Sequence, residues 1–280
     1  ESGQPRTDRS QQPGARGQAL AALTATGLPV ADKKILLYAP TWKGESFYRP
    51  SDTSAEVADV VHQLQAAVGD DWLVVAKVHQ VVYDAAVESG NLSGRLVDND
   101  IPTNLTLAAA DVLVTDYSSI FFDFLHLDRP ILFLLTDLPD YSSTRGLYES
   151  PDQLPGGKAE TVGDLCAKAA DLAAGEPEPS ADVALRHRWR AEYAPLDDGA
   201  ATSRVIDVVF RGKRSDLLVD IERDSRERML VYLGSMKSNG ITTSALNLLA
   251  NLDHDRFDVS VFYTYTGRGD QAKNIAAIDP

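Results

Sequence analysis

The chain has 280 residues, of which 44% are hydrophobic and 24% are charged, a composition typical of globular proteins. Its formal net charge of −14 argues against nucleic acid as a partner. The single cysteine, Cys166, excludes an internal disulfide, no Cys or His cluster has the spacing of a zinc site, and no apolar run approaches the roughly 18 residues of a membrane span.

Strand and helix patterns alternate along most of the chain. After a polar loop at residues 10–17, we expect strands at 34–39, 72–78, 95–97, 111–115 and 131–135. Helices are expected at 55–68, 103–110, 161–174 and 200–210, and a further helix begins at 118 and is stopped by Arg129-Pro130. Residues 137–158 are expected to form a loop. This order predicts an α/β fold, a Rossmann-like parallel sheet with helices on both faces. Because the loops after Ala39, Val78 and Thr115 carry polar side chains, we expect one cleft at the carboxyl edge of the sheet.

The pattern changes after residue 214. Residues 1–214 form the first predicted domain, and the highly charged residues 215–228 indicate a linker. Residues 229–280 then show a strand, a flexible loop, an amphipathic segment and a second strand. This short βαβ unit resembles the start of a two-lobed glycosyltransferase domain, and equally any Rossmann-like start. One such unit cannot bury a core by itself, so a second enzyme here would be largely missing.

The turn that follows residues 111–115 is the first candidate site. Ser118 and Ser119 open the predicted helix, where backbone N–H groups and the helix dipole suit a phosphate or pyrophosphate. A helix N-cap is the alternative, and the turn alone fits the cap better. Asp123 lies one turn further among apolar neighbours, so it needs a hydrogen-bond partner. A ligand hydroxyl or a backbone N–H of the first turn would supply one.

His79 is the strongest catalytic candidate among the five histidines. It follows the predicted strand at 72–78 directly, with Lys77 two residues before it, so both side chains are expected on one side of the strand. An imidazole can transfer a proton near neutral pH or stabilise phosphate charge. The other four histidines lie in positions that favour structural roles.

Several short motifs occur in the same order as in a known family. They are Gly3-Gln-Pro-Arg-Thr-Asp8, Leu37-Tyr-Ala-Pro-Thr-Trp42, Lys77-Val-His79, Asp116-Tyr-Ser-Ser119, Arg145-Gly146 and Asp198-Gly199. Together they resemble the nucleotide-binding lobe of the CDP-glycerol glycerophosphotransferases, the polymerases and primases of wall teichoic acid, over roughly three quarters of the chain.

The resemblance implies a role for each matching residue. Ser118, Ser119 and Asp123 would hold the phosphates and polyol of CDP-glycerol, and His79 would act beside the pyrophosphate. Donor-binding roles of lower rank fall to the remaining matches: Pro40, Thr41, Lys77, Arg6 and Arg145. The implied fold is the C-terminal lobe of a GT-B enzyme, with neither a metal nor a cofactor.

The implied reaction transfers glycerol phosphate from CDP-glycerol to an acceptor hydroxyl and releases CMP. The acceptor would be a lipid-linked or polymeric chain, and the enzyme would work at the inner face of the cell membrane. The family's acceptor lobe carries a His-Gly-Thr-Pro motif that this chain lacks, so we expect the chain alone to bind donor without turnover. A basic region could contact anionic lipid, although interspersed acids favour a solvated face; its members are Arg186, Arg188, Arg190, Arg204, Arg211, Lys213 and Arg214.

Two other functions compete with this interpretation. A nucleotide-sugar glycosyltransferase of the same architecture would be expected to carry a Glu-x7-Glu sugar clamp, which is absent. A non-catalytic nucleotide-binding domain would be favoured by loss of His79 or the serines, which are present. A dehydrogenase is disfavoured because no Gly-x-Gly-x-x-Gly follows a strand.

Overall fold

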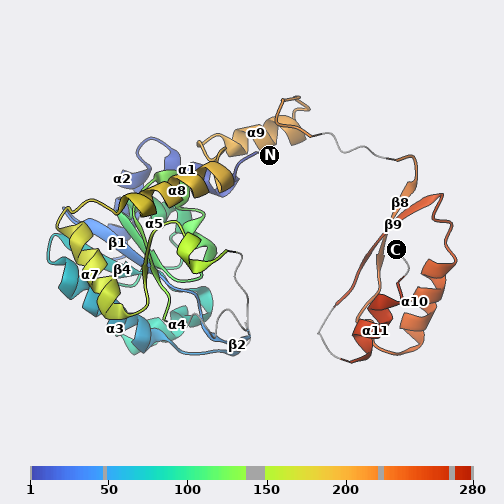
Figure 1. The fold of residues 1–280 in the computed structure, drawn as a ribbon, viewed down its shortest axis with the longest axis horizontal. Coiled ribbons are helices and arrows are strands. Elements are labelled where there is room, and N and C mark those ends of the chain that lie inside the picture. Colours follow the sequence, from blue (N-terminus) through green and yellow to red (C-terminus); the bar gives the residue numbers. More distant parts are fainter. Residues whose placement is uncertain (1, 47–48, 137–148, 220–223, 265–268, 279–280) are drawn as a thin grey trace. The chain divides into compact units, whose positions relative to one another are not determined.

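A computed structural model describes residues 2–46, 49–136, 149–219, 224–264 and 269–278. The chain divides into two compact units, Glu1–Leu218 and Val219–Pro280 (Figure 1).

A five-stranded parallel sheet forms the centre of the first unit. Its order is β4 (Trp72–Ala76), β1 (Lys34–Ala39), β5 (Val112–Thr115), β6 (Ile131–Leu134) and β7 (Gly157–Ala159). The predicted α/β fold with a parallel sheet is confirmed. Strand β7 begins at the end of the predicted loop at 137–158 and extends one residue beyond it. The predicted strand at 95–97 is only a single bridge between Ala76 and Leu96.

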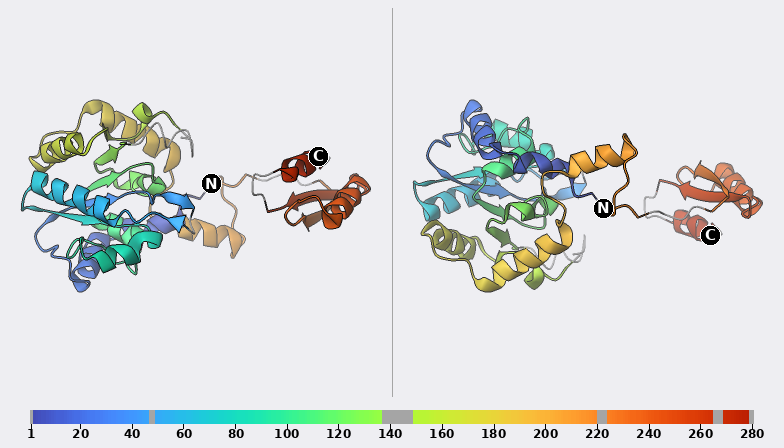
Figure 2. Two further views of the ribbon diagram at one scale, coloured as in Figure 1. Left: turned by 90° about the horizontal axis from the view of Figure 1, so that it is seen from below. Right: turned by 90° about the horizontal axis from the view of Figure 1, so that it is seen from above.

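Helices cover both faces of this sheet because the strand side chains alternate between two apolar cores. Leu37, Leu113 and Phe133 face one core, which packs against α2 (Ala15–Ala25), α5 (Thr103–Ala109) and α8 (Ser180–Tyr193). The neighbouring strand residues face the other core, covered by α3 (Ser54–Val68), α4 (Gln80–Ser89) and α7 (Val162–Ala173). Figures 1 and 2 show the sheet enclosed between these helices.

The N-terminal segment is helical where a loop was predicted. Residues 10–17 contain the end of α1 (Asp8–Gln11) and the start of α2, separated by a short turn. The single turn η1 (Pro5–Thr7) precedes α1. The remaining elements of this unit are the small hairpin of β2 (Gly44–Ser46) and β3 (Arg49–Pro50), the turn η4 (Pro151–Gln153), and α9 (Ala201–Val209).

The predicted helix at residue 118 is wrong. The structure has two 3₁₀ turns there, η2 (Ser119–Phe121) and η3 (Leu125–Leu127), joined by further i→i+3 hydrogen bonds. Both Phe121 and Phe124 are buried, and a turn of three residues places them on one side. Asp128 then adopts a left-handed conformation, with φ of 51°, so the turns end before Pro130. No α-helix dipole acts at the serines.

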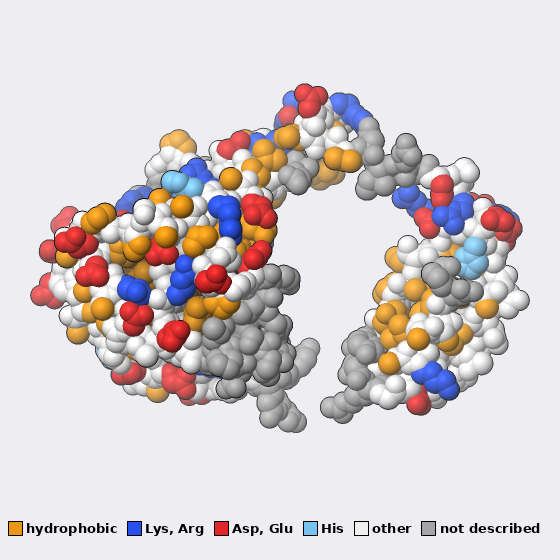
Figure 3. Space-filling view, viewed as in Figure 1, with side chains coloured by type: hydrophobic (Ala, Val, Ile, Leu, Met, Phe, Trp, Pro, Cys, Tyr) orange, Lys and Arg blue, Asp and Glu red, His pale blue; other side chains and the backbone are white. Residues whose placement is uncertain are grey.

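The second unit is a small parallel βαβ structure. Strands β8 (Glu227–Tyr232) and β9 (Phe257–Phe262) pair along their length, with α10 (Gly240–Ala250) between them and α11 (Asp270–Ala276) after them. The inner face packs around Leu233, Met236 and Leu249. Apolar side chains lie on the surface of this unit (orange in Figure 3). The exposed ones on the strands include Leu230, Tyr232 and Phe262.

Candidate functional site

The carboxyl ends of β4, β1 and β5 meet at one edge of the sheet, where they enclose a cavity of about 320 Å³. Each of the three strand ends contributes a residue that the sequence analysis singled out: His79, Pro40 and Ser118 respectively. The full lining is Ala39, Pro40, Lys77, Val78, His79, Gln80, Asn99, Thr103, Ser118 and Ile120. The structure therefore places these predicted site residues around a single cleft, as the alternation of strands and helices required.

His79 is the N-cap of α4. Its Nδ1 accepts a hydrogen bond from the Val81 backbone N–H at 3.3 Å, and its ring lies 6.1 Å from that of Trp42. Because Nδ1 is the acceptor, the proton of the neutral ring is on Nε2. The side chain is exposed at the cavity, so Nε2–H can donate to an oxygen of a bound phosphate.

Ser118 and Ser119 begin the 3₁₀ turns. The Ser118 Oγ accepts a long hydrogen bond, 3.4 Å, from the Ile120 N–H, so part of its role is a cap. Ser118 lines the cavity, whereas Ser119 is exposed next to it. In the absence of a long helix, any attraction for phosphate must come from hydroxyls, nearby N–H groups and cationic side chains.

Asp116 lies in one of the sequence motifs, which did not indicate a role for it. Its carboxylate accepts hydrogen bonds from the Thr41 N–H at 2.9 Å, the Thr41 hydroxyl at 2.6 Å and the Ser118 N–H at 3.1 Å. It therefore joins the loop after β1 to the loop after β5. Its i→i+2 bond to Ser118 is the local signal that sequence reasoning could have used, since an Asp that precedes a turn commonly makes this bond.

Thr41 lies on the far side of Pro40 from the cavity. Its hydroxyl is bonded to Asp116, and it lines a neighbouring hollow of about 250 Å³ with Lys43, Glu56 and Asp116. Pro40 borders both spaces. The structure thus gives Thr41 a position beside the main cavity rather than in its wall.

Lys77 is buried at the base of the cavity. Its Nζ donates to the carbonyl oxygens of Asp98, at 3.3 Å, and Ile101, at 3.0 Å. Burial disfavours the charged amine and lowers the pKa of Lys77 to about 8. Lys77 therefore fixes the segment that carries Asn99 and Thr103 into the cavity wall, and it also brings a titratable charge there.

Arg6 and Asp123 form an ion pair although 117 positions separate them. The Arg6 Nε and Nη2 donate to Asp123 Oδ1 at 2.9 and 2.8 Å. The Asp123 side chain is 13% exposed and that of Arg6 is 61% exposed. Burial raises the pKa of Asp123, although Arg6 opposes the shift. Asp123 lies three residues beyond Ile120, one turn away from the cavity wall.

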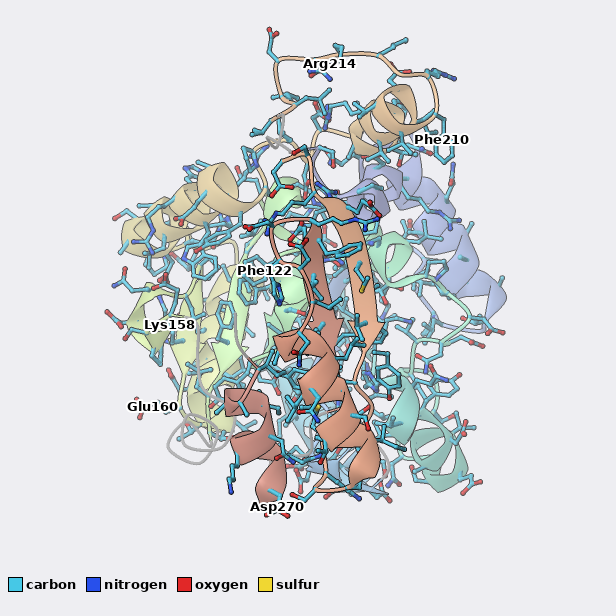
Figure 4. The ribbon with its side chains drawn as sticks, turned by 90° about the vertical axis from the view of Figure 1, so that its right-hand side faces the viewer. Phe122, Lys158, Glu160, Phe210, Arg214 and Asp270 are labelled. Carbon is cyan, nitrogen blue, oxygen red and sulfur yellow. The ribbon has the colours of Figure 1, made fainter. Side chains whose placement is uncertain are left out.

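The remaining candidates lie away from the cavity or outside the described residues. Arg145 lies outside the described residues. Most of the basic region is engaged by polar or acidic partners: Arg186 with Glu178 and Asp128, Arg188 with Gln153, Arg190 with Asp128, Arg204 with Asp198, and Arg211 and Lys213 with Asp207. Phe210 is 79% exposed at the end of α9, and Arg214 follows it (Figure 4).

The described residues also bear on metal binding and on membrane insertion. Within the described ranges, no group of three or more His, Cys, Asp or Glu side chains could hold a metal ion. Among the helices of those same ranges, none combines the length and apolarity needed to cross a membrane. Burial raises the pKa of Cys166, in keeping with a packing role.

Comparison with known sequences gives one family. The sequence model described as CDP-Glycerol:Poly(glycerophosphate) glycerophosphotransferase matches residues 1–211. A teichoic acid glycerol-phosphate transferase of Staphylococcus aureus (strain NCTC 8325 / PS 47) is 31% identical over 192 residues, 67% of this chain and 48% of the relative. The teichoic acid poly(glycerol phosphate) polymerase of Bacillus subtilis (strain 168) is 28% identical over 186 residues, 65% of this chain and 24% of the relative.

Comparison with solved structures gives the same result. The wall teichoic acid polymerase TagF is similar, with a TM-score of 0.61 and 25% identity over 76% of this chain and 52% of that chain. A variant of TagF soaked with CDPG gives the same score and identity, covering 76% of this chain and 51% of that chain. The chain thus spans about half or less of the length of the proteins it matches.

Proposed function

The chain belongs to the CDP-glycerol:poly(glycerophosphate) glycerophosphotransferase family, and we propose that it supplies the donor-binding lobe of a transferase. The enzyme would move glycerol phosphate, or a related polyol phosphate, from CDP-glycerol to an acceptor hydroxyl and release CMP. The observation that carries the proposal is the convergence of Pro40, His79 and Ser118 on one cavity, within the residues that match the family. The family expected from the sequence motifs is confirmed.

The cavity's chemistry suits the pyrophosphate of the donor. Lys77 brings a cationic amine below pH 8, His79 can donate from Nε2, and Ser118 adds a hydroxyl at the opposite wall. The Arg6–Asp123 pair next to it offers a guanidinium for phosphate and a carboxylate for polyol hydroxyls.

In the transfer step, the acceptor oxygen would attack the phosphorus that carries glycerol. The bond from that phosphorus to the bridging oxygen breaks, and CMP leaves with the bond's electron pair. The acceptor's proton must pass to a base. Charge grows on the departing phosphate, so a hydrogen bond from His79 Nε2–H strengthens in the transition state.

The family membership also suggests an acceptor and a cellular location for the reaction. We propose a lipid-linked or polymeric acceptor of the teichoic acid type. The similar proteins are named as a teichoic acid polymerase and a teichoic acid transferase, which supports the polymer class. We place the enzyme at the inner face of the cell membrane. The paired basic region favours a solvated surface over a lipid contact.

Residues 229–280 are proposed to begin a second, Rossmann-like glycosyltransferase unit, after a linker at 215–228. Parallel strands are normally covered on both faces. Leu230 and Tyr232 are 71% and 58% exposed on the β8–β9 pair, which supports a further layer of structure over this face.

Donor binding can be tested with a double substitution, Ser118→Ala and Ser119→Ala. We expect CDP-glycerol affinity, measured by calorimetry, to fall by about 1–3 kcal/mol because charge-assisted hydrogen bonds are lost. Ser203→Ala, an exposed serine on α9, is the control. Equal affinity of the double variant and the parent would leave the serines as caps only. Parallel titrations with CDP-ribitol and UDP-glucose identify the donor class, and preference for UDP-glucose would favour a glycosyltransferase.

Donor affinity should also depend on pH through Lys77. Its pKa in the folded chain is lowered to about 8, so the amine is charged below that pH and neutral above it. The pyrophosphate diester of the donor has no proton to lose in this range. We therefore expect affinity to fall by about tenfold between pH 7 and 9.5, the scale of one charged hydrogen bond. Lys77→Met should bind CDP-glycerol weakly at both pH values, with no dependence on pH. If the affinity of the parent does not depend on pH either, Lys77 does not take part in donor binding.

A further inference from the structure

The 3₁₀ turns from Ser119 to Asp128, called the ridge below, direct every third side chain to the same side. The hydrogen bonds from Asp123 N to Ile120 O and from Leu127 N to Phe124 O are of the i→i+3 type. With three residues per turn, the side chains of Ile120, Asp123 and His126 lie on the same side. Ile120 is in the cavity wall, so a displacement of this ridge also displaces the wall.

The N-terminal segment is linked to this ridge at two points. Arg6 holds Asp123, and the Ser10 Oγ lies 2.7 Å from Nε2 of His126. The Ser10 hydroxyl donates its own proton to the Thr7 carbonyl at 2.6 Å, so His126 Nε2–H is the donor to Ser10. His126 is only 6% exposed, and burial lowers its pKa to about 4, which keeps the ring neutral.

The other side of the N-terminal segment is held by residues that precede and begin α9. Asp197 Oδ1 accepts the Gln4 N–H at 2.7 Å, immediately before the turn that carries Arg6. The Asp8 carboxylate accepts the N–H groups of Ala201 and Thr202 at 3.0 and 2.7 Å. Gly3 has φ of +75°, and a Cβ there would collide with the Leu196 carbonyl oxygen. Arg6 is thus presented from a segment with little freedom to move.

We propose that His126 and Asp197 are positioning residues for the Arg6–Asp123 pair, holding it at the edge of the donor cavity. This inference rests on the proposed function. His126 fixes the ridge that carries Asp123, and Asp197 fixes the turn that carries Arg6. Neither residue lines the proposed donor cavity.

Both His126 and Asp197 contain a buried polar atom that lowers the stability of the folded state, which supports a role beyond packing. Among the described residues, Nδ1 of His126 and Oδ2 of Asp197 are buried without a hydrogen-bond partner. A buried polar atom without a partner destabilises the folded state, and an apolar side chain of similar volume would avoid that loss. The hydrogen bonds made by their other polar atoms, from His126 to Ser10 and from Gln4 to Asp197, are what these two polar side chains supply in return.

The test compares disruptive with conservative variants of the whole chain. His126→Leu removes the donor to Ser10, whereas His126→Gln restores an N–H group near the position of Nε2. Asp197→Ala removes the acceptor for Gln4, whereas Asp197→Asn retains one. His62→Leu, at an exposed histidine of α3, is the control. The readouts are CDP-glycerol affinity, the thermal midpoint, and the ¹⁵N NMR signal of the Arg6 Nε–H, assigned with Arg6→Lys.

We expect the Leu and Ala variants to lose the Arg6 signal and about tenfold or more in affinity, and the Gln and Asn variants to keep both within about threefold. Unchanged signal and affinity in Leu and Ala, or equal losses in Gln and Leu, would overturn the proposal. If His126→Leu does not fold, Ser10→Ala removes the same link and must show the same losses. If the parent does not bind CDP-glycerol, the proposed function fails, while the Arg6 signal still decides whether these residues position the pair.

Discussion

Replacing His79 by alanine in an enzyme that also contains the acceptor lobe should lower turnover by roughly 10²–10⁴-fold, the range for a positioned acid, base or charge stabiliser. Donor affinity should fall by no more than about tenfold, because Lys77 and Ser118 still face the ground-state pyrophosphate. Turnover and CDP-glycerol affinity are measured on the same preparation. His62→Ala, at an exposed histidine of α3, should match the parent.

The capping role of His79 complicates this experiment, and a second variant resolves it. Alanine also removes the cap of α4, at a cost of about 0.5–2 kcal/mol in stability. Asparagine is a favoured N-cap, so His79→Asn should keep α4 intact while it lacks a donor at the position of Nε2. We expect His79→Asn to be as stable as the parent and nearly as slow as His79→Ala. Parental turnover in His79→Asn would mean that the histidine serves the helix alone.

The sequence predicts the sheet and the edge that carries the candidate cavity because both depend on local patterns. Four of the five strands are short apolar runs, and the polar residues that follow Ala39, Ala76 and Thr115 stand where parallel strands place their ligands. Helix α8 is not predicted from the sequence. Only Arg186 and Trp189 of its fourteen residues are buried, so it lacks an apolar stripe. Strand β7 has only three residues and lies between Gly156 and Glu160, so it does not stand out from a loop in the sequence.

The partners of the site residues could not be read from the sequence. Asp123 was expected to need a ligand hydroxyl or a local N–H, and its partner is Arg6, 117 positions away. Likewise His126 meets Ser10 across 116 positions, and Asp116 meets Thr41 across 75. Such pairs depend on which loops the fold brings together. The choice between an α-helix and 3₁₀ turns after Ser118 was equally hidden, since both place Phe121 and Phe124 on one side.

The residue that sequence reasoning missed leads to the second large effect. Asp116→Ala leaves three donors without an acceptor: the Thr41 N–H, the Thr41 hydroxyl and the Ser118 N–H. We expect the free energy of unfolding to fall by about 2–4 kcal/mol, since hydrogen bonds to a charged group are among the stronger ones. Denaturant unfolding measures this loss.

Donor affinity should fall with it, by about 10–100-fold, because Asp116 joins the loop that carries Pro40 to the turn that carries Ser118. Thr41→Val removes only the hydroxyl donor and should produce a small part of both losses. Asp116→Asn keeps one acceptor oxygen and should lie between parent and alanine variant in calorimetric titrations with CDP-glycerol. Parental affinity in a destabilised but folded Asp116→Ala would show that the two loops reach the donor independently. A fall in affinity would mean that the donor requires the two strand ends to be held together, which is the role the geometry assigns to this carboxylate.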